Sequence, residues 1–278
     1  MTQTLVIERQ GPVALATLAR PEKHNAFDDA LVAELTEALR ELEADDAVRV
    51  VVLSATGRSF CAGADLNWMR RMAGYSREDN QRDAMALAAL MRTLDQFGKP
   101  TIARVQGPAY GGGVGLVACC DVVVASQAAH FALSEAKLGL VPAVISPYVV
   151  AAIGARAARR YFLSAERFSA SEAWRLGLVH ELAMDDDDLD AKIGEIVESM
   201  LACGPVAQRE GKALVRAVAN RPVTGELLQQ TSELIARVRA SPEGREGIAA
   251  FLEKRRAAWL PPPPPPEPDD EGETPAGI

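Results

Sequence analysis

The sequence predicts an α/β fold, because stretches typical of buried strands alternate with stretches typical of amphipathic helices. β-Branched residues dominate 48–54 and 121–125, as in strands that are covered on both faces. Before the first of these strands, leucines and alanines recur every three or four residues over 30–42, and between the two strands 76–97 is also expected to be a helix. The alternation indicates stacked layers of helix and sheet.

The other elements follow in chain order. A hairpin is expected at 4–8 and 13–18, and Asp28 or Asp29 is expected to cap the helix after it. A further strand at 100–105 leads into a glycine-rich segment. Beyond Gly154 the pattern is helical, and the expected helices are 155–163, 169–177 with a serine cap and a glycine stop, 188–202, 205–219, 223–239 and 243–258.

Composition and charge exclude several classes of function. The chain is 48% hydrophobic and 24% charged, as in an ordinary soluble globular protein. Its net charge is −8, but five acidic residues and no basic residue follow Leu260, so the preceding body carries about −3. The sequence has no basic stripe of the kind that binds nucleic acid. No stretch approaches the roughly 20 apolar residues of a membrane helix. We therefore expect neither nucleic acid nor membrane as a partner.

Cysteine and histidine usage indicates a reduced compartment and no metal centre. The four cysteines show no CxxC spacing, and the three histidines lie far apart in the sequence. The first residues lack the apolar core of a signal peptide. A cytoplasmic location and the absence of a bound metal are the resulting expectations.

Two segments about fifty residues apart offer backbone N–H groups to a ligand. One is 59–66, SFCAGADL, and the other is 107–115, GPAYGGGVG, whose glycines lead into an apolar run that is expected to be a buried helix over 114–119. Two amides that converge on one oxygen form an oxyanion hole, which stabilises negative charge as it develops.

Together with other stretches, these two segments resemble the crotonase (enoyl-CoA hydratase/isomerase) superfamily. The matching stretches are Arg20-Pro21 with Asn25-Ala26, the turn 62–66, the triple glycine 111–113, and 131–139, FALSEAKLG. The resemblance implies the crotonase fold, a ClpP-like spiral of β-β-α turns, over residues 1–200. It also implies a C-terminal helical segment over 201–260 that assembles the chain into a homotrimer or homohexamer. Six consecutive prolines and an acidic mix make 261–278 an expected disordered tail.

The resemblance also implies an acyl-CoA thioester as substrate. Its carbonyl oxygen would be held by the amides of Ala62 and Gly112, and the enolate formed from it would be stabilised there. Ala64, Asp65 and Leu66 match the place where the family seats the adenine end of CoA. The CoA moiety is part of the substrate, so no separate cofactor is expected.

Three further positions match the family's CoA site. Lys23 lies in a loop that the family places beside the CoA phosphates, where a cation is physically suitable. Phe251 and Lys254 match positions that complete the CoA site, often from a neighbouring subunit.

The acid and base chemistry depends on Glu135. Hydratases of this family typically use two glutamates that hold a water molecule; Glu135 matches the second, and Gly115 occupies the position of the first. One carboxylate can protonate or deprotonate the carbon beside the thioester. The sequence therefore leaves three functions open: a hydratase, a double-bond isomerase, and a homologue that binds an acyl-CoA or RNA without turnover.

The segments 115–121, 133–135 and 142–148 resemble those of methylglutaconyl-CoA hydratase-like and isohexenylglutaconyl-CoA hydratase-like proteins, whose substrates carry a second carboxylate. We interpret the chain as an enoyl-CoA hydratase for a branched glutaconyl-type thioester such as 3-methylglutaconyl-CoA. A hypothesis accompanies this interpretation: Gly115 removes a negative charge and so admits the substrate's own carboxylate.

Overall fold

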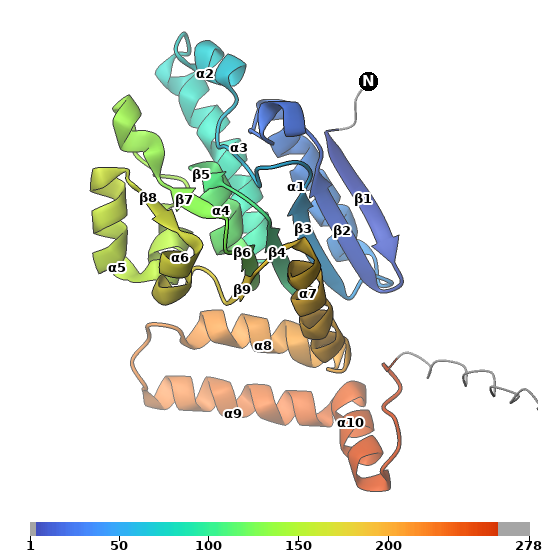
Figure 1. The fold of residues 1–278 in the computed structure, drawn as a ribbon. Coiled ribbons are helices and arrows are strands. Elements are labelled where there is room, and N and C mark those ends of the chain that lie inside the picture. The colour runs from blue at the N-terminus through green and yellow to red at the C-terminus, as the bar shows by residue number, and fades with distance from the viewer. Residues whose placement is uncertain (1–3, 261–278) are drawn as a thin grey trace, which may run out of the picture.

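The larger of two sheets has six strands in the order β1-β2-β3-β4-β6-β9 (Figure 1). The computed structural model of the chain describes residues 4–260. β1 and β2 form an antiparallel hairpin, and every later neighbour in this sheet pairs in parallel. The strands are β1 (Leu5–Gln10), β2 (Val13–Leu18), β3 (Val50–Ala55), β4 (Thr101–Val105), β6 (Val122–Ser126) and β9 (Glu181–Ala183).

A second, three-stranded sheet lies beyond the carboxyl ends of these strands. In it, β5 (Ala109–Tyr110) pairs in parallel with β7 (His130–Ala132), which pairs antiparallel with β8 (Arg167–Ser169). The chain thus passes from β4 to β5 and from β6 to β7, leaving the large sheet for the small one each time. These repeated passages form a spiral, and they place the glycine segment at the edge between the two sheets.

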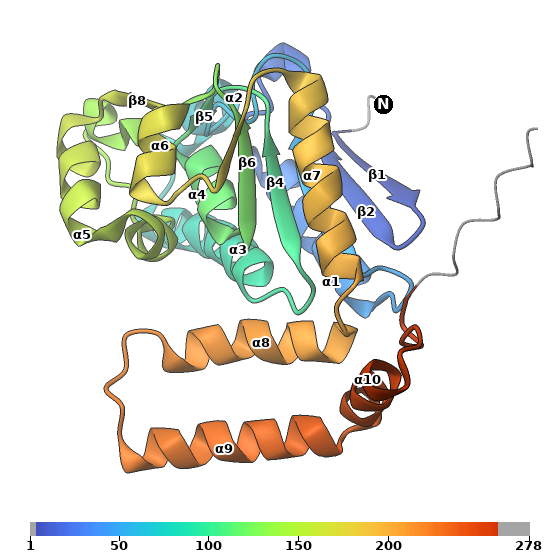
Figure 2. The same ribbon diagram turned by 60° about the horizontal axis from the view of Figure 1, so that its bottom comes forward.

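Helices cover both faces of the large sheet. α7 lies on one face, and α1, α3 and α4 lie on the other (Figure 2). Along β3, Val51 and Leu53 belong to the main core with α1, α3 and α4, whereas Val50 and Val52 pack with Leu189 of α7. This alternation is the period-two pattern of a strand that is buried on both faces. The helices that surround the spiral are α1 (Asp29–Ala44), α2 (Leu66–Met72), α3 (Arg77–Asp95), α4 (Gly112–Cys119), α5 (Ser146–Ser164), α6 (Ala170–Leu176) and α7 (Asp186–Leu201).

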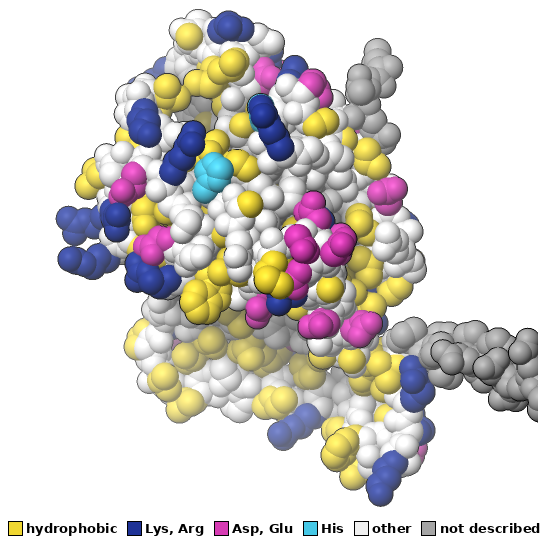
Figure 3. Space-filling view, in the orientation of Figure 1, with side chains coloured by type: hydrophobic (Ala, Val, Ile, Leu, Met, Phe, Trp, Pro, Cys, Tyr) yellow, Lys and Arg dark blue, Asp and Glu magenta, His cyan; other side chains and the backbone are white. Residues whose placement is uncertain are grey.

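The last three helices form an arm below the spiral in Figure 1. They are α8 (Pro205–Val218), α9 (Gly225–Ala240) and α10 (Pro242–Glu253). Lys212 of α8 reaches the spiral, because its Nζ lies 2.7 Å from Asp121, whose carboxylate also accepts from the Thr101 amide and hydroxyl. Hydrophobic side chains are visible over the arm in Figure 3, and several are more than half exposed: Val223, Leu228, Ile248, Phe251 and Leu252.

The structure confirms the α/β class, most predicted helices, the cap at Asp28 and the serine cap at Ser169. It also shows a Ser76 cap on α3, which was not predicted. The prediction of helix only beyond Gly154 was too short, since α5 begins at Ser146 and continues across a non-helical Gly154. The short strands β5, β7, β8 and β9 were not predicted, because two or three residues carry too little periodicity to identify a strand.

The boundary predicted at residues 200 and 201 falls at the end of α7, and the division into domains stays a prediction. The predicted tail at 261–278 lies outside the described residues. Among the helices of residues 4–260, none combines the length and the apolar character that crossing a bilayer requires.

Candidate active site

The turn from Gly63 to Asp65 leaves the backbone N–H of its middle residue without a hydrogen bond to the described chain. Phe27 pairs with this turn on both sides, because its N–H donates to the Gly63 carbonyl at 2.7 Å and its carbonyl accepts from the Asp65 N–H at 2.6 Å. In such a parallel bridge the middle residue directs its own N–H to the opposite side. Within residues 4–260, the N–H of half-buried Ala64 accordingly has no acceptor.

The prediction that Ala62 supplies the first oxyanion donor was wrong. Its N–H donates to the His24 carbonyl at 2.9 Å, so it is already bonded within the protein. A donor of this kind must be free and aimed at the reacting oxygen before the substrate arrives. Ala64, which the sequence assigned to CoA binding, meets that requirement.

Gly112 presents the second free amide. It is the first residue of α4, and within the described chain its N–H has no acceptor. The preceding Gly111 has φ 49°, a conformation that favours glycine, and its own N–H is bonded to the Ala132 carbonyl at 2.9 Å. This strand-to-helix turn therefore directs the Gly112 amide and the positive end of the helix dipole toward the site.

Glu135 lies beside these glycines. A Cβ at Gly111 would be 3.1 Å from Oε1 of Glu135 and 4.0 Å from the Cα of Gly63, so the three residues meet at one point. The other carboxylate oxygen, Oε2, is buried and has no hydrogen-bond partner among residues 4–260. Burial raises the pKa of Glu135, which brings both its neutral and charged forms within reach of a proton-transfer reaction.

The space beside Gly115 is filled by apolar side chains. A Cβ at this position would lie 2.3 Å from Cγ2 of Ile145 and 3.2 Å from Cε of Met91, and both of these residues are buried. These apolar neighbours argue against the hypothesis that Gly115 admits a substrate carboxylate by removing a negative charge, and that hypothesis stays a prediction. Burying an unpaired carboxylate against hydrocarbon would be strongly unfavourable.

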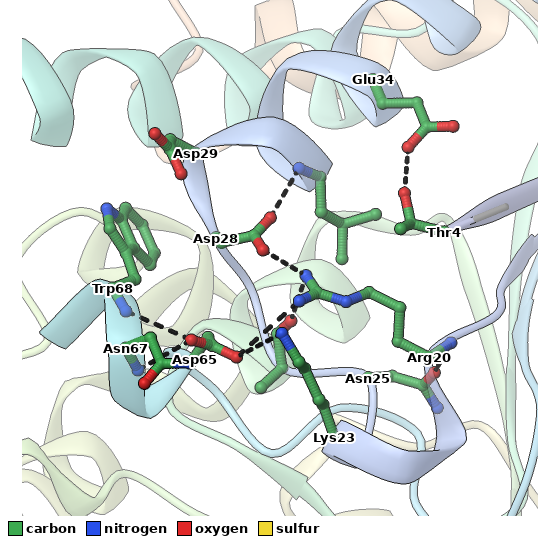
Figure 4. A network of polar contacts seen from close by, with 12 residues as sticks. Thr4, Arg20, Lys23, Asn25, Asp28, Asp29, Glu34, Asp65, Asn67 and Trp68 are labelled. Carbon is green, nitrogen blue, oxygen red and sulfur yellow. Dashed lines mark hydrogen bonds and ion pairs between the residues drawn. The ribbon is translucent and has the colours of Figure 1, made fainter. Parts of the chain in front are cut away.

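An ionic network joins the turn to the segment around Phe27 (Figure 4). Arg20 lies between two carboxylates, 2.7 Å from Asp28 and 3.7 Å from Asp65, and Lys23 is 3.4 Å from Asp65. Asp65 also caps α2 by accepting from the amides of Asn67 and Trp68. Burial alone would raise the pKa of Asp65, but these two amides and Lys23 outweigh it and lower that pKa.

The remaining residues assigned to CoA divide into two groups. Lys23 is about two-fifths exposed and Leu66 is exposed, and both lie next to the Gly63 to Asp65 turn. Phe251, 83% exposed, and Lys254 lie on or just after α10, at the opposite end of the molecule from α2 in Figures 1 and 2. One chain therefore does not bring them to the site, and their contribution from a neighbouring subunit stays a prediction.

A nearby thiol is excluded as a nucleophile. Cys61 is fully buried, and this burial raises the pKa of its thiol to about 12. A thiol with so high a pKa stays protonated near neutral pH and is unreactive. Free amides and one carboxylate are thus the chemically useful groups that the described residues bring together here.

The sequence interpretation missed Phe27 as well as the role of the Ala64 amide. Phe27 directly precedes Asp28, the cap of α1. An apolar residue at that position commonly packs on the following helix, so the sequence around Phe27 indicated only the start of a helix. Only the pairing of residues far apart in sequence shows which amide stays unbonded.

Two free amides on neighbouring turns, a glutamate with a buried carboxylate oxygen beside them and a spiral of two sheets define a crotonase-fold protein. Residues 8–261 match the family described as enoyl-CoA hydratase/isomerase, and the chain belongs to that family.

Solved and curated relatives agree over nearly the whole length. The crystal structure of an enoyl-CoA hydratase from Shewanella pealeana is 45% identical with a TM-score of 0.90, covering 93% of this chain and 96% of that one. A 2,3-dehydroadipyl-CoA hydratase of Escherichia coli is 33% identical over 90% of this chain and 96% of the relative. Mevalonyl-coenzyme A hydratase sidH of Aspergillus fumigatus is 35% identical over 90% and 92%, respectively.

Gly112→Ala tests the second amide. An added Cβ would lie 2.6 Å from Cε2 of Phe27, so the amide or the ring must move. We expect kcat to fall by about 10²-fold or more, the typical cost of losing one oxyanion donor. Gly194→Ala is the matched control, because its Cβ would meet nothing within 4 Å in α7. Equal kcat values for the two variants, measured by steady-state kinetics, would contradict the role of Gly112.

Glu135→Gln tests the burial of the carboxylate through stability. Because the pKa of Glu135 is raised in the folded state, its contribution to stability is lost as pH rises through that raised value. We therefore expect the variant to unfold at higher urea concentration than wild type at about pH 8, with the difference shrinking toward about pH 4, below the ordinary glutamate pKa. Exposed Glu41→Gln is the control. A difference between wild type and Glu135→Gln that does not vary with pH would contradict the burial argument.

Proposed function

We propose that this enzyme hydrates the α,β double bond of an enoyl-CoA. The observation that carries the proposal is the orphaned, buried Oε2 of Glu135 beside two backbone amides without acceptors. A thioester enolate needs donors on its oxygen and a proton carrier beside its α-carbon, and this arrangement supplies both. The relatives named as hydratases support the same reaction.

The reaction follows from the roles of these groups. The thioester oxygen accepts hydrogen bonds from Ala64 and Gly112, which draw electrons toward it. Water adds to the β-carbon and transfers a proton to the Glu135 carboxylate, while the electron pair of the double bond moves to the oxygen and forms the enolate. Protonated Glu135 then delivers that proton to the α-carbon, so water is added and the enzyme is restored.

A raised pKa suits this double duty. A glutamate with an ordinary pKa is almost fully ionised at neutral pH and holds a proton weakly. Burial brings the pKa of Glu135 closer to the working pH, so the carboxylate accepts a proton from water more readily and still releases it to carbon.

A double-bond isomerase is the second candidate, because the described site holds one carboxylate where paired carboxylates would hold a water. Gly115 and its apolar neighbours Ile145 and Met91 leave no second acceptor at that position. One carboxylate is sufficient to remove a proton from one carbon and return it to another. Product structure therefore separates the two functions.

For the substrate we infer a branched glutaconyl-type thioester such as 3-methylglutaconyl-CoA. Support comes from the resemblance of 115–121, 133–135 and 142–148 to glutaconyl-CoA hydratases. It also comes from the Escherichia coli relative, which is named for a dehydroadipyl thioester. Adipyl and glutaconyl chains both end in a carboxylate.

We further propose that the chain works as a homotrimer or homohexamer in which the arm of one subunit covers the site of the next. Exposed apolar residues on α9 and α10, such as Leu228 and Phe251, need a partner surface in water. This arrangement would bring Phe251 and Lys254 to the CoA of the neighbouring subunit. In analytical ultracentrifugation we expect three or six times the 29.7 kDa chain mass, and a monomer would contradict the assembly.

Product identification tests the function directly. Wild type and Glu135→Gln are each mixed with 3-methylglutaconyl-CoA and with crotonyl-CoA, and products are separated by chromatography and mass spectrometry. We expect a product heavier by one water from wild type, and a rate about 10²- to 10⁴-fold lower from Glu135→Gln, because the proton carrier is gone. The 3-methylglutaconyl thioester should give the higher kcat/KM.

Other outcomes separate the alternatives. A shifted alkene of unchanged mass would establish the isomerase, and thioester binding without any product would establish the non-catalytic homologue. Comparable kcat/KM for crotonyl-CoA and 3-methylglutaconyl-CoA would contradict the proposed specificity and leave the hydratase activity standing.

A further inference from the structure

We propose that Phe27 is the positioning residue that sets the spacing of the two oxyanion donors, with Arg20 holding Phe27 in place. The inference rests on the proposed function, because it concerns the amides of Ala64 and Gly112. Phe27 is 1% exposed, so it acts on the reaction only through the groups it touches.

The backbone of Phe27 fixes the first donor. Its N–H and carbonyl bond to Gly63 and Asp65 at 2.7 and 2.6 Å, one on each side of Ala64. The Ala64 N–H and the Gly63 carbonyl belong to the same peptide group. This group cannot rotate without breaking the hydrogen bond from the Phe27 N–H. Free rotation would let this amide turn toward a protein acceptor, as the Ala62 amide does with His24.

The ring of Phe27 fixes the second donor. Its Cε2 and Cδ2 atoms lie 2.6 and 3.0 Å from the position that a Cβ of Gly112 would occupy, so the ring edge rests against the glycine itself. A rigid ring in this place limits how far the start of α4 can move toward Phe27. A smaller side chain would leave a gap into which the start of α4 can shift.

Arg20 in turn fixes Phe27 from both neighbours. Its guanidinium donates to the Ala26 carbonyl at 3.2 Å and pairs with Asp28 at 2.7 Å, the residues directly before and after Phe27. Its backbone N–H also donates to the Asn25 side chain at 2.8 Å. Arg20 is 5% exposed, and its planar guanidinium with several donors serves the Ala26 carbonyl and Asp28 together in a geometry that a lysine ammonium does not reproduce.

Phe27 therefore links the segments that carry the two donors. One aromatic side chain contacts the segment of the second donor while its own backbone holds the segment of the first. A displacement of about 1 Å between catalytic groups can cost about 10²-fold in rate. Because a displaced donor weakens the interaction with the enolate oxygen that develops during the reaction, this loss should fall on kcat and leave KM nearly unchanged.

The experiment compares Phe27→Leu with Phe97→Leu in crotonyl-CoA and 3-methylglutaconyl-CoA hydration. Phe97 is also fully buried, but it lies between α3 and the start of β4, whereas the glycine segment follows the other end of that strand. Both variants lose the same ring from a packed interior. We expect Phe27→Leu to lower kcat by about 10- to 100-fold with KM within about threefold of wild type, and Phe97→Leu to retain the wild-type kcat.

Thermal unfolding and oligomer mass are measured for both variants, and kinetics are read well below the lower melting temperature. If Phe27→Leu fails to fold, Arg20→Lys provides the second test. It keeps the buried charge, and the same selective fall in kcat is expected.

The outcomes distinguish the two levels of inference. Inactive wild type would overturn the proposed function, whereas an active wild type whose kcat survives in Phe27→Leu, or in Arg20→Lys when the first variant does not fold, would overturn the positioning role alone. Parallel losses in Phe27→Leu and Phe97→Leu would also overturn it, because they would show a general effect of core packing.

Discussion

Two backbone amides left without acceptors are the constraint on which the rest of this structure depends. Buried N–H groups are nearly always paired in proteins, so keeping two of them free at one point requires every neighbouring peptide to be committed elsewhere. The hydrogen bonds that do this join the Gly63 carbonyl and the Asp65 N–H to Phe27, the Ala62 N–H to the His24 carbonyl, and the Gly111 N–H to the Ala132 carbonyl. The small sheet and the turn at residues 61–65 exist in the form that makes these pairings possible.

Most charged groups around the site are also held by specific partners. Asp65 and Asp28 are the caps of α2 and α1, and Arg20 stands between them in the interior. Removing one partner from a buried ion pair leaves an uncompensated charge, which is why such networks hold their geometry firmly. Glu135 differs from these residues, because its Oε2 has no hydrogen-bond partner within the described chain. Stability is lost at that residue, and a carboxylate ready to exchange protons is the result.

The arm of α8 to α10 has a different character from the spiral. Its helices are joined to the core by polar contacts such as Lys212 with Asp121, while large apolar side chains of α9 and α10 face outward. A helix pair with an uncovered apolar face is incomplete as a folded unit in water. The arm is therefore the part of the chain that exposes an apolar face, and the spiral is the part that carries the amides and Glu135.

The sequence by itself determined the alternation of helices and strands, the caps at Asp28 and Ser169, and the two glycine-containing segments, because these depend on local periodicity and on residue types at adjacent positions. It also singled out Glu135, which burial makes chemically distinctive. Tertiary structure alone decided that the Ala62 amide is bonded and the Ala64 amide is free, since the answer lies in the pairing with His24 and Phe27, more than thirty residues away. It likewise decided that Ile145 fills the space at Gly115, because packing against a glycine leaves no signal in the glycine's own sequence neighbourhood.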